Sequence, residues 1–146
     1  MRFYSFTNMY LSPIQKGIQT AHAVHDMFVK YHDSLRENTH DGEWALYEQW
    51  AHEHKTIVVL DGGNSAELGN LFSQLDTFTH GYPYVKFHED DVSLNGALTC
   101  VGIILDEKMI ELVKMSRDDA WNLPKGFCTN DEIAVAKLVS QYHLAR

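Results

Sequence analysis

Hydrophobic positions follow two different periods along this chain, and the changes between them predict its elements. Phenylalanine and tyrosine recur in a loosely alternating pattern over residues 2–10, which indicates a strand. Apolar residues then recur at helical spacing, which predicts the buried stripe of a helix that extends to about residue 31. This stripe consists of Ile14, Ile18, Ala21, Val24 and Phe28. Ser12 is a suitable N-cap for the helix, and Gln15 is placed to complete a capping box.

The rest of the chain alternates between helical patterns and short apolar runs. Helices are expected over 43–55 and 106–115, and two more are expected directly after Asn64 and Thr129. Strands are expected over 56–60, 81–89 and 97–105. Asn64 and Thr129 each have a glutamate three residues later, as in a capping box. The run TIVVL at 56–60 is typical of a strand buried on both faces. The turn dipeptide Asn95-Gly96 predicts that the last two strands are antiparallel neighbours.

This order of elements predicts an α/β fold with three α/β/α layers. We expect a small mixed sheet of about four strands, covered by helices on both sides, with an extra C-terminal helix. The 146 residues contain no internal repeat or linker, so 1–146 is interpreted as a single domain. A chain of this length buries roughly two thirds of its unfolded surface.

Charge and composition limit the classes of function. A net charge of −8 argues against broad, charge-driven binding of nucleic acid, although it leaves room for a local basic patch. No apolar run approaches the ~20 residues of a membrane span, and the first residues lack the apolar core of a signal peptide. Two cysteines form no disulfide framework, and nine scattered histidines form no recognised zinc motif. We therefore expect a cytoplasmic protein without membrane contact, cofactor or metal.

Three segments, in this order, resemble type II peptidyl-tRNA hydrolases and their shorter relatives. They are Gln-x-x-His-Ala at 19–23, Lys-Thr-Ile-Val-Val-Leu at 55–60 after a tryptophan-containing helix, and Thr-x-x-Gly-Ile at 99–103. The resemblance covers about 1–115 as a domain core and leaves about 116–146 as a helical extension. It implies a four-stranded mixed sheet between helices and hydrolysis of the ester between a peptide and the 3′ end of tRNA.

The chain departs from the family pattern at two places. The family has a Gly-Lys pair before Gln-x-x-His, whereas here Gln15 holds the place of that lysine and Lys16 follows it. The family's Asp-Ala-Gly-x-Thr segment is absent, and the run His-Glu-Asp-Asp at 88–91 occupies its region. Thr99 does match the threonine that opens the family's last strand.

The resemblance and the residue types together nominate a site. The candidate catalytic residues are Lys16, Gln19, His22, Glu89, Asp90 and Thr99, and the candidate substrate-binding residues are Gln15, Lys16 and Asp91. A carboxylate from the acidic run would activate water, while the start of the first helix would favour an oxyanion or phosphate. Each has a plainer alternative: a solvated acidic turn, a capping box beside an exposed lysine, a core histidine, and a threonine that merely favours a strand.

Two functions remain open. The first is a peptidyl-tRNA hydrolase-like esterase, with peptidyl-tRNA or another RNA or nucleotide as its ligand. The second is a catalytically inactive binding module on the same scaffold, engaging a protein, nucleotide or RNA partner. The C-terminal helix could also mediate a homodimer. Gathering of Lys16, Lys86 and either Lys55 or Lys30 beside the acidic run would favour tRNA as the ligand.

Overall fold

The centre of the fold is a mixed sheet of four strands. The computed structural model describes residues 1–34, 39–78, 80–119, 121–123 and 126–146. Its strands are β1 (Arg2–Thr7), β2 (Ile57–Asp61), β3 (Tyr84–His88) and β4 (Leu98–Leu105), in the spatial order β2-β1-β4-β3. β1 is parallel to β2 and antiparallel to β4, and β4 is antiparallel to β3. The predicted antiparallel pairing of the last two strands is therefore confirmed.

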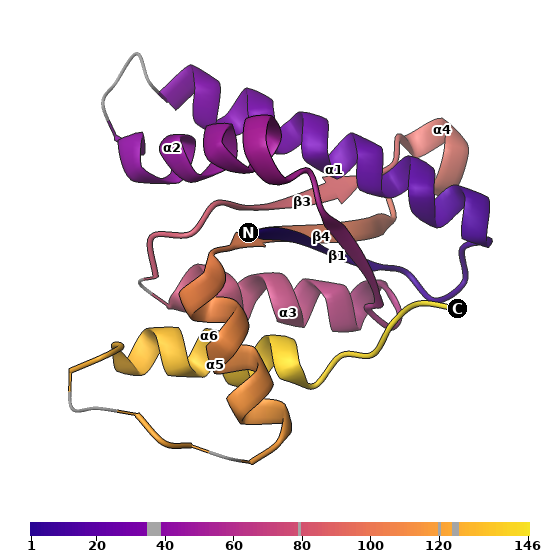
Figure 1. The fold of residues 1–146 in the computed structure, drawn as a ribbon. Helices are drawn as coiled ribbons and strands as arrows, with labels where there is room; N and C mark the ends of the chain where they lie inside the picture. Colours follow the sequence, from indigo (N-terminus) through magenta and orange to yellow (C-terminus); the bar gives the residue numbers. More distant parts are fainter. Residues whose placement is uncertain (35–38, 79, 120, 124–125) are drawn as a thin grey trace.

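Helices cover both faces of this sheet (Figure 1). One face carries α1 (Pro13–Ser34), α2 (Asp41–Gln49) and the π-helical turn η2 (Trp50–His54). The other carries α3 (Ser65–Thr77), α5 (Glu107–Arg117) and α6 (Asn130–Ser140). A single helical turn, α4 (Asp91–Leu94), lies in the connection between β3 and β4. The predicted three-layer α/β/α fold with a four-stranded mixed sheet is confirmed.

Strand β4 divides the core into two halves because all its residues are buried and successive side chains point to opposite faces. Cys100 and Ile104 pack on the side of α1, whereas Val101 and Ile103 pack on the side of α3 and α5. The expected C-terminal helix, α6, packs on α5. Its Val135 and Val139 belong to the second half of the core, so α6 shares the core of the sheet.

The predicted capping boxes are present. The side chain of Asn64 accepts from the N–H groups of Ala66 and Glu67, and the Glu67 carboxylate accepts from the N–H of Asn64 at 2.7 Å. Ser12 and Gln15 exchange the same pair of bonds at the start of α1, at 2.9 and 3.3 Å. α6 begins with the third box, at Thr129 and Glu132. These signals depend only on residues three apart, which is why the sequence is sufficient to find them.

The predicted buried face of α1 is wrong. Ile14 and Ile18 are 78% and 47% exposed. The buried side of this helix instead consists of Lys16, Gln19, Thr20, Ala23, Met27 and Tyr31. Its first two turns bury polar residues, and the hydrogen bonds described below offset the cost of burying them. The spacing of apolar residues alone therefore indicates the wrong side of the helix.

Strand β2 also differs from its prediction. It is an edge strand, and Ile57 is 43% exposed, so it is not buried on both faces. Residues beyond α6 run along its outer edge. The N–H of Asp61 donates to the carbonyl of His143 at 2.9 Å, and the N–H of Ala145 donates to the carbonyl of Val59 at 3.0 Å. We call residues 142–146 the tail segment; it covers part of an otherwise open sheet edge.

Gly102 in the middle of β4 is required by close packing. A Cβ at this position would overlap the ring of Phe3, which is fully buried and cannot move aside. We expect Gly102→Ala to lower the free energy of unfolding by about 1–3 kcal/mol, the usual cost of overpacking a core. Gly69→Ala is the matched control, because a Cβ in this part of α3 meets nothing within 4 Å. It should raise stability by about 0.5–1 kcal/mol. Urea unfolding of both variants checks the pair, and a Gly102→Ala protein as stable as wild type would contradict the packing.

The histidine that precedes β3 bonds two backbone groups. His80 Nδ1 accepts from the N–H of Tyr82 at 3.0 Å, and Nε2 donates to the carbonyl of Leu75 at 3.2 Å. Only the neutral imidazole can do both. Burial lowers the pKa of His80, and Lys30 acts in the same direction, although the Leu75 carbonyl and Glu43 oppose them.

This lowered pKa predicts a pH dependence of stability. The unfolded histidine has a pKa of about 6.5, so the contribution of His80 is present above that pH and is lost as pH falls toward the folded pKa. The difference in unfolding free energy between wild type and His80→Gln should therefore be smaller at pH 5 than at pH 7.5. His52→Gln, at an exposed histidine of η2, is the matched control for the loss of an imidazole. A constant difference for His80→Gln would contradict the prediction.

Candidate functional site

Buried polar side chains gather toward one end of the sheet, where parallel strands β1 and β2 end. They are Ser5, Thr7, Asn8, Lys16, Gln19, Thr20 and Thr99. The first two turns of α1 lie over this end, and β3 and the start of β4 complete it (Figure 1). The carboxyl edge of parallel strands is where α/β proteins usually place their ligands.

Three candidate residues form a hydrogen-bonded chain at this edge. The Thr99 hydroxyl donates to Gln19 Oε1 at 2.9 Å, and Gln19 Nε2 donates to Glu89 Oε1 at 2.6 Å. Thr99 and Gln19 are 1% and 4% exposed, whereas Glu89 is half-buried. Within the described residues, Oε2 of Glu89 has no hydrogen-bond partner. These two hydrogen bonds therefore fix Oε1 of the Glu89 carboxylate and leave Oε2 available.

A second set of hydrogen bonds anchors α1 to the sheet. The Thr20 hydroxyl donates to the carbonyl of Lys16 at 2.8 Å and lies 2.6 Å from the Ser5 hydroxyl on β1. Because the proton of Thr20 is already used, Ser5 donates to Thr20. Ser5 Oγ also lies 3.2 Å from Cys100 Sγ. Burial raises the pKa of the Cys100 thiol to about 12, so this cysteine is a packing residue and not a nucleophile.

Lys16 belongs to a different part of this end of the molecule. Its side chain is 6% exposed, and Nζ donates to the carbonyl of Arg146 in the tail segment at 3.2 Å. Lys16 lines a pocket of about 720 Å³ together with residues 61–63, Glu67 and the tail segment. None of Gln19, Glu89 and Thr99 lines that pocket. Lys16 is therefore not the exposed lysine of the plainer alternative, and it lines a different pocket from the hydrogen-bonded residues.

The other candidate residues lie outside the hydrogen-bonded chain. His22 is exposed, with its ring 4.6 Å from the ring of Phe87, so it is not a core histidine. Asp90 is an exposed N-cap of α4 that accepts from the N–H of Ser93 at 2.6 Å, and this bond lowers its pKa. Asp91 is exposed, and so is Gln15, whose amide closes the capping box.

Three of the candidate lysines, Lys16, Lys30 and Lys86, make separate contacts. Nζ of Lys30 lies over the ring of Tyr84 at 4.2 Å, near the start of β3. Lys86 lies over the ring of Phe72 at 4.8 Å. Lys16 contacts the tail segment instead. Among the residues that the structure describes, these three lysines therefore do not form the gathering beside the acidic run that would have favoured tRNA.

Two contributors to this end were missed. Asn8 follows β1 and donates to Ser65 Oγ at 3.1 Å and to the carbonyl of Leu98 at 3.4 Å, which ties β1 to α3 and β4. An asparagine directly after a strand was the available signal. The tail segment was also missed, and no local pattern predicts its contact with Lys16, since 130 residues separate them.

Comparisons with known proteins give no assignment: no family model matches this chain, and no curated protein matches it significantly. None of the described helices is long and apolar enough to cross a membrane. No three histidine, cysteine or acidic side chains in the described part of the chain are grouped so that they could hold a metal ion.

The different environments of the two cysteines predict different reactivity. Cys100 is fully buried with a raised pKa, whereas Cys128 is half-exposed. At pH 8 a thiol with a pKa of about 12 is thiolate in only ~10⁻⁴ of molecules. Iodoacetamide should therefore modify Cys128 in the folded protein and leave Cys100 unmodified, as measured by peptide mass spectrometry. Both should react in denaturant, and equal modification in the folded protein would contradict the burial of Cys100.

Proposed function

We propose that this protein hydrolyses an ester of the peptidyl-tRNA class, with Glu89 as the general base. The observation that supports this most is the chain from Thr99 through Gln19 to Glu89, which holds a carboxylate at the carboxyl edge of the sheet. The resemblance of 19–23 and 99–103 to type II peptidyl-tRNA hydrolases supplies the substrate class. Two of these three residues, Gln19 and Thr99, stand at positions that match the family's motifs.

The reaction assigns a separate role to each residue. Glu89 Oε2 takes a proton from water as the oxygen of that water attacks the acyl carbonyl. The tetrahedral intermediate then collapses, the bond from the acyl carbon to the 3′ oxygen breaks, and Glu89 returns the proton to that oxygen. Gln19 is a positioning residue that holds Glu89, and Thr99 sets the direction of the Gln19 amide.

A second candidate function is a binding module without turnover. The observation that favours it is the hydrogen bond from Lys16 to the Arg146 carbonyl. Lys16 is the candidate cation on the first turns of α1, and this bond already gives its ammonium group a partner. The absence of gathered lysines beside Glu89 in the described residues points the same way. Under this alternative the hydrogen bonds from Thr99 through Gln19 to Glu89 have a structural role, and no bond of the ligand is broken.

Substitution of the base separates the two candidates. We expect Glu89→Gln to lower kcat for hydrolysis of N-acetyl-aminoacyl-tRNA by about 10²–10⁴-fold, because the amide cannot accept the proton of water. Gln19→Met should lower kcat with little change in KM, since it leaves the base in place but unheld. Glu48→Gln, an exposed carboxylate on α2, is the matched control and should have wild-type activity.

The same experiment has a clear negative result. Full activity in a folded Glu89→Gln protein would contradict the role of the base. Hydrolysis no faster than in buffer by the wild type would leave the binding module as the function. Urea unfolding of each variant shows whether a loss of activity reflects a loss of fold.

A further inference from the structure

Three of the four arginines of this chain line one pocket, on the face of the sheet opposite α1. They are Arg2, Arg117 and Arg146, and the fourth, Arg36, lies outside the described residues. The pocket has a volume of about 750 Å³, within the usual range of about 300–1,000 Å³ for small-molecule sites. We call it the arginine pocket.

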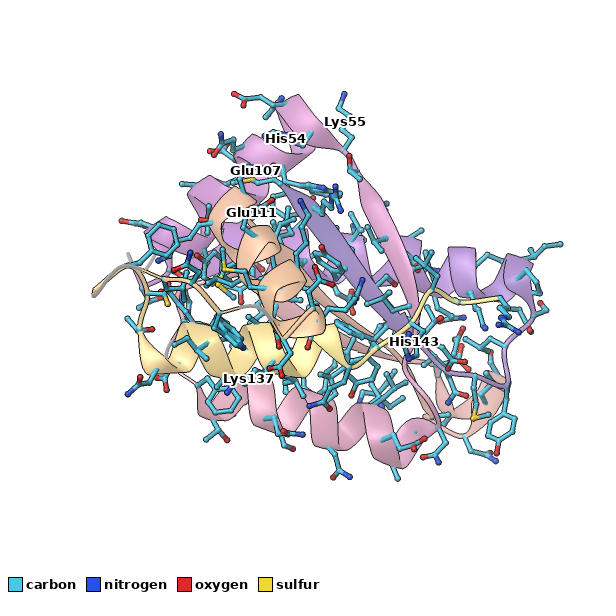
Figure 2. All side chains as sticks on the ribbon, turned by 60° about the horizontal axis from the view of Figure 1, so that its bottom comes forward. His54, Lys55, Glu107, Glu111, Lys137 and His143 are labelled. Carbon is cyan, nitrogen blue, oxygen red and sulfur yellow. The ribbon has the colours of Figure 1, made fainter. Side chains whose placement is uncertain are left out.

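Its walls come from segments that are far apart in the sequence. α5 forms one wall and the tail segment forms the other, with β1 and β2 between them. Figure 2 looks onto this face and shows His143 on the tail segment, across from Glu107 and Glu111 on α5. The contact between the tail segment and the edge of β2 fixes the second wall.

The charge of the arginine pocket is opposite to that of the protein. The chain has 20 acidic residues against 12 lysines and arginines, yet no aspartate or glutamate lines this pocket. Lys114 and His143 add to the three arginines. Two acidic side chains on α5 have cationic partners of their own: Glu111 pairs with Lys114 at 2.6 Å, and Glu107 pairs with the amino group of Met1. Both carboxylates are exposed rather than part of the lining.

The three arginines have guanidinium groups available for a ligand. Within the described residues, no carboxylate lies within 4.0 Å of Arg2, Arg117 or Arg146. Arg117 donates from Nη2 to the carbonyl of Tyr142 at 3.4 Å, a long bond that uses one of its five donors. Guanidinium groups bind carboxylate and phosphate alike with two parallel hydrogen bonds. Three arginines around one pocket match the higher charge and the three acceptor oxygens of a phosphate group better than a single carboxylate.

The floor of the arginine pocket is apolar. It includes Tyr4, Val58 and Leu60 from the sheet and Ile110 and Val113 from α5. A bare phosphate would leave this surface in contact with water, whereas an organic group attached to the phosphate would cover it. Apolar walls with a few placed polar groups are typical of sites that bind organic molecules.

From this arrangement we infer that the arginine pocket binds an organic phosphate of nucleotide size. The phosphates contact Arg2, Arg117 and Arg146, and the organic part lies on the apolar floor. None of Gln19, Glu89 and Thr99 lines this pocket, so the site is separate from the proposed hydrolytic site.

Calorimetry with three small molecules tests this inference. The titrants are ADP, adenosine and inorganic phosphate, each at low and at high salt. We expect ADP to bind, adenosine and phosphate to bind at least tenfold more weakly, and the affinity for ADP to fall as salt rises. Arg117→Gln should weaken ADP binding at least tenfold, and Arg2→Gln is a second variant on a different element.

The control and the overturning results are equally specific. Lys86→Gln removes an exposed cation on β3, the opposite edge strand, and should leave ADP binding unchanged. No binding of ADP at millimolar concentration would overturn the inference, as would equal weakening by Lys86→Gln and Arg117→Gln. Phosphate binding as tight as ADP would overturn the assignment of an organic phosphate. Thermal unfolding confirms that each variant is folded.

Discussion

Polar groups buried beneath the first turns of α1 must find hydrogen-bond partners, and the proposed site depends on this constraint. A buried polar group without a partner costs about 1–3 kcal/mol, so seven such residues could not remain together unsatisfied. None of the buried side-chain nitrogen or oxygen atoms in the described residues lacks a partner. Thr20 and Ser5 hold the helix on β1, and Thr99 and Gln19 hold it over β4. Glu89 is fixed as a consequence of the same network.

This network also explains which features of the structure could be predicted from the sequence. The capping boxes, the order of the elements along the chain and the number of strands depend on patterns within a few residues, and the structure agrees with them. The buried side of α1 could not be found in this way. Ile14 and Ile18 have the apolar period of a core face, but Lys16 and Gln19 are the residues that are buried. Their burial is favourable only because partners come from distant segments, which no local pattern reveals.

The tail segment is the clearest case of such non-local structure. It pairs with the edge of β2, contacts Lys16 through a carbonyl and forms one wall of the arginine pocket. The candidate site predicted from the sequence is thereby divided: Gln19, Glu89 and Thr99 lie together, whereas Lys16 faces the tail segment. Three arginines, at positions 2, 117 and 146, line the pocket on the other face of the sheet.

The most direct test of the proposed hydrolysis is the fate of the water oxygen. The wild-type protein would be mixed, in excess over the substrate, with N-acetyl-aminoacyl-tRNA in ¹⁸O-labelled water. Mass spectrometry would then measure the mass of the released N-acetyl-amino acid. Attack by a water that Glu89 activates predicts one ¹⁸O in the released carboxylate after a single turnover and none in Glu89. Release no faster than in buffer, or released acid without the label, would contradict the account.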